Sequence, residues 1–170
     1  HQEARRQRQM CIRDRDNRPM LILKITDNNG MYGWGEVWCN FPLTGAEHRA
    51  KLIDNVFKPL LTNFNIITPE KTYEYLVSKT KILSIQSGEP GPIAQCIAGI
   101  DIAIHDLIGK VENISLWKKF GGNKNIIPCY ASGINPTKPE VTVKDAIKKG
   151  YSSFKLIIGF GLKYDFGNIN

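Results

Sequence analysis

Residues 91–122, GPIAQCIAGIDIAIHDLIGKVENISLWKKFGG, decide the fold of this chain. Apolar side chains recur in this stretch at steps of three and four residues, which places them on one stripe of a helix. These side chains are Ile93, Cys96, Ile97, Ile100, Ile104, Leu107 and Ile108. Pro92 stands where a helix tolerates a missing N–H, and Gly109 followed by Lys110 is typical of a helix end. The pattern therefore predicts a long core helix that ends at Gly109, followed by a short helical piece over 115–120.

A series of short motifs runs through this stretch and through the sequence on either side of it. They are G-W-G-E at 33–36, A-G-I-D-I-A-x-x-D-L-x-G-K at 98–110, L-W-x-x-x-G-G at 116–122, P-x-Y-A-S-G at 128–133 and G-Y-x-x-F-K-L-x-x-G-F-G at 150–161. In this order the motifs resemble the mandelate racemase and muconate-lactonizing branch of the enolase superfamily. The resemblance covers about residues 20–170 and is specific to the superfamily, but it does not single out one reaction.

The resemblance implies a fold of two parts. The first is an α+β capping domain, a short antiparallel sheet with helices, and the second is the start of a TIM-type α/β barrel. The domain boundaries that we expect are 20–124 for the capping domain and 125–170 for the first βαβ unit of a truncated barrel. The chain would then be the N-terminal portion of an enzyme roughly twice as long, because a complete barrel takes about 250 residues.

The opening of the chain differs from the rest in composition. It holds six of the seven arginines, against Glu3, Asp14 and Asp16, which gives it a net charge of +3 out of the total of +7. Only Arg49 lies beyond it, because the remainder of the chain uses lysine. This break indicates that residues 1–19 are foreign to the gene, and we expect them to be disordered. The alternative, a basic arm that binds nucleic acid, lacks interleaved aromatic residues, so we expect no nucleic-acid partner.

Composition also bears on the membrane and on the compartment. Hydrophobic residues make up 42% of the chain, but no uninterrupted apolar run of 18 residues exists, so we expect no membrane partner. Charges interrupt every apolar stretch near the N-terminus, which argues against a typical signal peptide. The four cysteines, Cys11, Cys39, Cys96 and Cys129, lie far apart, which is typical of reduced thiols in a cytoplasmic protein.

Apolar spacing and turn residues predict the remaining elements. In chain order these are strands over 20–26 and 31–39, helices over 44–63 and 68–80, a strand over 126–131, a helix over 141–149 and a strand over 153–158. The turn at 27–30, DNNG, joins the first two strands, because Asn and Gly accept positive φ. On the second helix we expect Tyr73, Leu76 and Val77 to face inward, and we expect a polar loop at 84–90. The last three elements form a βαβ unit, which the resemblance implies to be the start of the barrel.

Three acidic residues invite interpretation as catalytic or metal-binding groups. Asp101 and Asp106 lie on the long helix, but five residues apart they face different sides, so we expect capping and salt bridges instead. His105 stands where family members often carry tryptophan, and we expect a structural role for it. Asp165 lies where the family shows a helix start, and we interpret it as a cap rather than a ligand.

Two groups of residues are candidates for the active site. The resemblance implies that Trp38, Asn40 and Phe41, in the loop after the second strand, bind the substrate as the loop closes over it. Ordinary cross-strand packing is the alternative for Trp38. The resemblance also implies that Ser132, after the first barrel strand, binds substrate and that Lys155, on the second, is catalytic. Without the resemblance, Lys155 would be interpreted as a surface lysine at the barrel rim.

Lys155 matches the first lysine of the K-x-K pair that stands beside the substrate carboxylate in the family. Members abstract the proton α to that carboxylate, and Mg²⁺ together with fixed positive charge stabilises the resulting enediolate. The second lysine, often the base, is replaced here by Ile157, which strand alternation places on the same face. Because an isoleucine cannot accept a proton, the sequence favours one-base dehydration over two-base racemisation.

The resemblance thus implies a Mg²⁺-dependent enzyme that acts on a small carboxylate, a sugar acid or hydroxy acid, as a dehydratase or racemase. The metal ligands would lie beyond the end of this chain, so the chain alone would be inactive, and the whole protein would be a homo-oligomer. One alternative is a cycloisomerase or dipeptide epimerase of the same superfamily. The other is a stand-alone, non-catalytic binding or interaction module.

Overall fold

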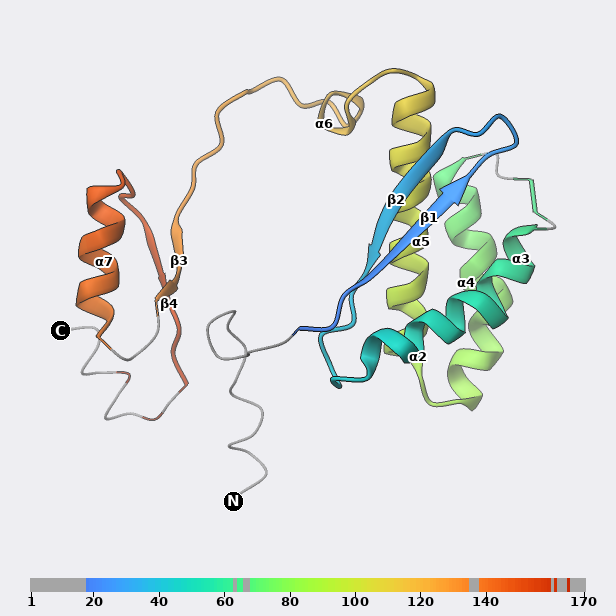
Figure 1. Cartoon of the computed structure of the whole chain (residues 1–170), viewed down its shortest axis with the longest axis horizontal. Coiled ribbons are helices and arrows are strands. Elements are labelled where there is room, and N and C mark those ends of the chain that lie inside the picture. The colour runs from blue at the N-terminus through green and yellow to red at the C-terminus, as the bar shows by residue number, and fades with distance from the viewer. Residues whose placement is uncertain are drawn as a thin grey trace. The chain divides into compact units, whose positions relative to one another are not determined.

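The computed structural model of the chain describes residues 18–62, 64–65, 68–134, 138–159, 161 and 165 (Figure 1). The sequence predicts that the opening of the chain is disordered. Residues 1–17 of that opening lie outside the residues that the structure describes. Contacts divide the rest into two compact units, one from Arg18 to Asn123 and one that begins at Lys124.

A β-hairpin forms one side of the first unit. Strand β1 (Leu21–Thr26) pairs antiparallel with β2 (Tyr32–Val37) in the register Leu21–Val37 to Thr26–Tyr32. In the turn, the Asp27 carboxylate accepts hydrogen bonds from the backbone N–H groups of Asn29 and Met31 at 2.9 and 2.8 Å. Gly30 adopts a φ of 85°, which favours glycine. The hairpin predicted from alternation and turn residues is therefore confirmed.

The long helix α5 (Pro90–Val111) packs on this hairpin through glycines (Figure 1). A Cβ atom at Gly33 would lie 2.0 Å from the Ala103 carbonyl oxygen, and one at Gly35 would lie 2.0 Å from that of Gly99. A Cβ at Gly99 would in turn lie 2.5 Å from Cγ2 of Val37. Packing therefore explains the glycines in the motifs at 33–36 and 98–110, because larger side chains would separate the helix from the strand.

The other helices of the first unit cover the same core. Helix α2 (Gly45–Leu52) continues through a π-helical segment, η2 (Ile53–Phe57), into α3 (Lys58–Thr62), and α4 (Pro69–Gln86) lies against α5. A short helix, α6 (Leu116–Lys119), follows α5. The buried cluster comprises Val37, Phe57, Leu76, Ile93, Cys96, Ile97, Ile100 and Ile104. The apolar stripe predicted for the long helix is thus the centre of the core.

Helix α4 differs from its prediction in length and in the face that it buries. It continues to Gln86, so the polar loop expected from residue 84 was wrong at its start. Tyr73 and Val77 are exposed, and Thr72 and Thr80 are buried beside Leu76 instead. Each buried threonine donates its hydroxyl hydrogen to the backbone carbonyl four residues earlier, at 2.8 Å. This local hydrogen bond satisfies the hydroxyl and lets a polar residue occupy the core face.

Gly109 lies inside α5 rather than at its end, which corrects the predicted boundary. Asn113 takes the left-handed conformation instead, with a φ of 52°. The N–H of Ile114 donates to the Gly109 carbonyl at 2.9 Å and that of Asn113 to the Lys110 carbonyl at 3.2 Å, a Schellman pattern. A Cβ at Gly109 would lie 3.1 Å from Leu116 Cδ2, so close packing explains this glycine.

By length and composition alone, α5 could cross a membrane. Its sequence contains no uninterrupted apolar run of 18 residues, because Asp101 and Asp106 lie within the helix. In the structure its apolar stripe packs against β2 and α4. That is the arrangement of a core helix rather than of a helix that faces lipid.

The second unit contains a βαβ arrangement. Strand β3 (Ala131–Ile134) pairs in parallel with β4 (Phe154–Leu156), and α7 (Pro139–Lys148) lies between them in the chain and packs on β3 (Figure 1). The strand predicted over 126–131 was wrong, because β3 begins where that range ends. Pro128 stands inside the predicted strand and has no N–H to donate to a ladder.

Candidate functional site

The loop between β2 and α2 carries the first group of predicted site residues. Trp38 and Phe41 lie with their ring centroids 6.2 Å apart and their planes tilted by 41°. Both rings are about half exposed, at 48% and 45%, while Asn40 between them is partly buried. The structure thus brings the two aromatic side chains together at the surface.

Close backbone packing holds the two ends of this loop together. A Cβ at Gly45 would lie 2.6 Å from the Cys39 carbonyl oxygen, and the Gly45 N–H donates to the Pro42 carbonyl at 2.9 Å. Cys39 is buried, and burial raises the pKa of its thiol. Burial raises the pKa of Cys96 to about 12. Both thiols are therefore protonated at neutral pH and are not activated nucleophiles.

The second group lies on the parallel strands of the other unit. Ser132 is exposed within β3, not after it, which corrects its predicted place. Lys155 is the central residue of β4, the strand on which the sequence predicted it, and it is exposed. Ala131 pairs with Phe154, and each candidate directly follows one of these two residues. The register shifts between Ala131 and Ile134, so this pairing does not by itself place Ser132 and Lys155 on one face of the sheet.

Acidic side chains near α5 serve the fold. The Asp106 carboxylate accepts the backbone N–H of Trp34 at 2.8 Å and the Lys110 ammonium at 2.7 Å. This hydrogen bond from Lys110 lowers the pKa of Asp106. Asp101 lies 3.9 Å from Nε2 of His105. The salt bridge expected for Asp106 is therefore present, with Lys110, and Asp106 also joins α5 to the outer edge of β2.

No group of three or more His, Cys, Asp or Glu side chains that could hold a metal ion occurs among the residues that the structure describes. The Asp165 carboxylate accepts the backbone N–H of Gly159 at 3.1 Å from each oxygen, which closes the loop after β4. The described His, Cys, Asp and Glu side chains therefore do not fit a Mg²⁺ site, since that ion prefers an octahedral set of oxygen ligands.

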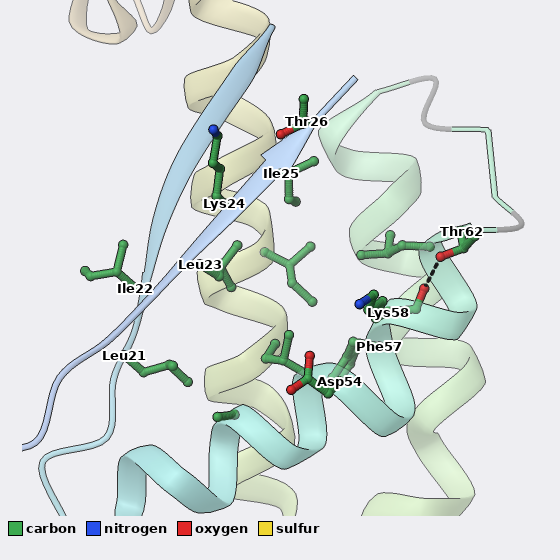
Figure 2. A pocket seen from close by; sticks show the side chains of 14 residues that line it. Leu21, Ile22, Leu23, Lys24, Ile25, Thr26, Asp54, Phe57, Lys58 and Thr62 are labelled. Atoms are coloured by element: carbon green, nitrogen blue, oxygen red, sulfur yellow. Dashed lines mark hydrogen bonds between the residues drawn. The ribbon is translucent and has the colours of Figure 1, made fainter. Parts of the chain in front are cut away.

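A cavity of about 520 Å³ lies between β1 and the helical segments η2 and α3 (Figure 2). Leu23 and Ile25 point toward the helices, whereas Ile22 points away from them. Asp54 and Lys58 add charges to otherwise mainly apolar walls. None of the predicted site residues lines this cavity, so it is distinct from both groups described above.

Sequence analysis missed Arg49, which is buried where the loop joins α2. A signal was present, because Arg49 is the one arginine beyond residue 18 in a chain that otherwise uses lysine. Arginine presents a rigid fork of N–H donors that lysine cannot reproduce. A lone arginine in a lysine-rich sequence therefore marks a position where that fork is needed.

Comparison with known proteins places these observations in a family. The sequence model of the mandelate racemase / muconate lactonizing enzyme N-terminal domain matches residues 1–121. The D-gluconate/D-galactonate dehydratase of Picrophilus torridus is 31% identical over 142 residues, which are 80% of this chain and 34% of the relative. Other curated relatives are described as dehydratases, a cycloisomerase, a racemase and epimerases. The chain spans between 23% and 42% of the length of the curated relatives shown by these comparisons.

Solved structures show the same likeness. The mandelate racemase/muconate lactonizing enzyme of Bordetella bronchiseptica RB50 is 47% identical, with a TM-score of 0.84 over 89% of this chain and 42% of that one. A racemase of Streptomyces coelicolor A3(2), solved with bound magnesium, is 22% identical and shares the fold with a TM-score of 0.75. That match covers 91% of this chain and 49% of the racemase.

Proposed function

This chain belongs to the mandelate racemase / muconate lactonizing enzyme family of the enolase superfamily, and from that premise we propose that the whole protein is a sugar-acid dehydratase. The observation that carries the proposal is the family match over most of the first unit, together with several relatives described as dehydratases of sugar acids. The proposed substrate is a small carboxylate. A cytoplasmic location and a homo-oligomeric state remain predictions.

The proposed reaction removes two groups from neighbouring carbons of the substrate. A base takes the proton α to the carboxylate, and the electron pair left behind forms an enediolate. The β-hydroxyl group then leaves as water once it has taken a proton, and the enol product rearranges to a 2-keto acid. Negative charge develops on the carboxylate oxygens in the first step, so fixed positive charge beside them lowers the barrier.

Lys155 is the residue of this chain to which we assign that charge. Its position at the centre of β4 supports the assignment, since the groups of a barrel site project from strands toward one end. Ser132, on the neighbouring strand β3, is proposed to bind substrate. Ile157, two residues after Lys155 and just past the end of β4, carries no group that could move a proton. This supports a dehydratase, which needs one base, over a racemase, which needs one on each side of the substrate.

Trp38, Asn40 and Phe41 are proposed to close over the substrate from the capping domain. Their support is the exposed aromatic pair at the loop between β2 and α2. Magnesium enters the proposal as a cofactor whose ligands lie outside the described residues, because those residues do not form a site for it. No step of the reaction is therefore assigned to the metal.

The test is an assay of the protein from the complete gene with Mg²⁺ on D-galactonate, D-gluconate, D-xylonate and arabinonate. We expect 2-keto acid to form from at least one of them, and the α-proton to exchange in deuterated water. Lys155→Ala should lower both rates about 100-fold or more, as loss of a transition-state charge does. The matched control is Lys149→Ala, which removes an exposed lysine just after α7 and should leave both rates unchanged.

The outcomes distinguish a failure of the proposed function from a failure of the role assigned to Lys155. Wild-type protein that neither dehydrates nor exchanges any of these acids would contradict the proposed function. Exchange at the wild-type rate by Lys155→Ala would instead remove Lys155 from the mechanism and leave the dehydratase in place.

A further inference from the structure

Arg49 is the one charged side chain that is buried in the described part of the chain, with 5% of its surface exposed. It lies on α2, the helix that follows the Trp38–Thr44 loop. Burying a guanidinium group costs free energy unless its N–H donors find acceptors. The partners of Arg49 therefore indicate why an arginine is buried at this point.

Its guanidinium group joins α2 to α5. Nε and Nη2 both donate to Oε1 of Gln95, at 3.1 and 2.9 Å. Nη1 lies 3.5 Å from the Gly45 carbonyl oxygen and 3.5 Å from Nδ1 of His48. No ion pair between described residues includes Arg49. The group therefore acts as a cross-link between neutral acceptors rather than as half of a salt bridge.

The guanidinium group of Arg49 also lies beside the residue at which the loop ends and α2 begins. Gly45 is the first residue of α2, and a Cβ there would lie 3.4 Å from Nη1 of Arg49 and 2.6 Å from the carbonyl oxygen of Cys39. Cys39 stands between Trp38 and Asn40, so the two ends of the loop meet at Gly45, whose carbonyl oxygen lies 3.5 Å from Nη1 of Arg49. On the helix side, the thiol of Cys96 lies 3.7 Å from the Arg49 carbonyl oxygen.

A second contact ties the same two helices. Nε2 of His48 lies 3.1 Å from Oε1 of Glu89, the residue at the N-terminus of α5. An imidazole with its proton on Nε2 donates to Glu89 and accepts from Arg49 through Nδ1, so one tautomer fits both contacts. His48 is half exposed and Arg49 is buried, so the arginine is the inner member of the pair.

We propose that Arg49 is a positioning residue that fixes the loop carrying Trp38, Asn40 and Phe41 against α2 and α5. The fork of the guanidinium makes this possible, because it reaches Gln95 and Gly45 at once, whereas a lysine ammonium has no fixed fork. The relevance of the loop for substrate binding rests on the proposed function, but its anchoring does not.

The test compares Arg49→Met with the wild-type chain by hydrogen exchange. Methionine keeps an apolar stem of similar length and removes every donor. We expect amides between Trp38 and Gly45 to exchange about tenfold faster, while those of the α5 core keep their rates. The matched control is Lys51→Met, which removes an exposed cation from the same helix and should leave the loop unchanged.

A spectroscopic readout follows the loop directly. In a background with Trp34→Phe and Trp117→Phe, Trp38 is the remaining tryptophan of the chain. Its fluorescence should become easier to quench with acrylamide after Arg49→Met, and Arg49→Lys should restore at most part of the protection. A general loss of stability without loop release would change the melting temperature and leave this quenching unchanged in the folded state.

Gln95→Leu keeps the proposal testable if Arg49→Met fails to fold. It removes the acceptor that orients the guanidinium and leaves the arginine itself in place, so we expect the same faster exchange in the loop. Folded Arg49→Met or Gln95→Leu protein with wild-type exchange and quenching of the loop would overturn the proposal. A released loop in a protein without sugar-acid turnover would uphold the anchoring and contradict only the proposed function.

Discussion

The unit formed by residues 18–123 and the unit that follows it differ in how they treat apolar side chains. The first buries a contiguous cluster drawn from β2, η2, α4 and α5. Among its described residues the second buries only Ile134, Ala146 and Pro139. Around its strands Ile126, Ile127, Tyr130 and Ile158 are between 54% and 80% exposed. Both units are rich in such residues, so composition does not explain the difference.

Architecture explains it instead. In the first unit a long helix lies across one face of a hairpin and further helices pack around it, so its apolar stripe finds partners within the unit. Among its described residues the second unit offers one helix, α7, and two short parallel strands. Parallel strands are normally covered on both faces, and one helix covers at most one of them. The same residue types therefore make a core in one region and an apolar surface in the other.

The largest expected effect tests the core of the first unit. Ile100→Asp places an unpaired carboxylate at a position that is 2% exposed, which should cost about 4 kcal/mol or more and unfold the unit. Ile102→Asp is the matched control, because Ile102 lies on the exposed side of the same helix. Circular dichroism melting curves measure both. Native melting of Ile100→Asp would show that α5 does not bury this face.

A second measurement compares the units directly. Amides in β3 and β4 should exchange roughly 100-fold faster than those in β1 and β2, because few buried apolar contacts support the parallel pair. Hydrogen exchange followed by mass spectrometry resolves the two hairpin strands from the two parallel strands. Equal protection in the two sheets would contradict the contrast drawn here.

Gly35→Ala tests the close contact between β2 and α5. The added Cβ would lie 2.0 Å from the backbone oxygen of Gly99, so the strand and the helix must move apart. We expect a loss of about 1–3 kcal/mol in the free energy of unfolding, as overpacking causes. Gly91→Ala is the control, because a Cβ there meets no atom within 4 Å outside its chain neighbours. Pro92 follows it and disfavours the helical conformation for a residue with a Cβ, which offsets the helix propensity of alanine, so we expect a change within about 0.5 kcal/mol. Denaturant titration of both variants checks the difference.

The smallest effect concerns Asp106 and the pH dependence of stability. The hydrogen bond from Lys110 lowers the pKa of Asp106 in the folded state below its unfolded value of about 3.9. The contribution is therefore present above that unfolded value and is lost as the pH falls through the folded pKa. Asp106→Asn should cost about 0.5–1 kcal/mol at pH 7 and flatten the acid side of the stability curve.

The control for this pH effect is Asp145→Asn, which changes an exposed carboxylate 3.5 Å from Lys148. Urea titrations between about pH 2 and 7 measure the free energy of unfolding of each variant. If the free energy of unfolding falls with the same slope below pH 5 in the wild-type chain and in Asp106→Asn, the role given to the Asp106 carboxylate is contradicted.

Much of the first unit could be predicted because its signals are local. Alternation and the Asp27–Gly30 turn predicted the hairpin, and the three- and four-residue spacing predicted α5. The site was harder. The loop with Trp38 and Phe41 entered only through the resemblance, since no spacing rule says that two rings three residues apart in a loop meet at the surface. The structure adds their contact, and the role of the loop in binding remains a proposal.

The sequence by itself determined the elements whose signals lie in neighbouring residues: the hairpin and the helical stripe of α5. Only the tertiary structure decided which face of α4 is buried, where β3 begins and why Arg49 is enclosed. The physical reason is that periodicity records which residues share a face of one element, whereas burial depends on which partner covers that face. Partners such as Gln95 for Arg49 stand far along the chain, and only folding brings them together.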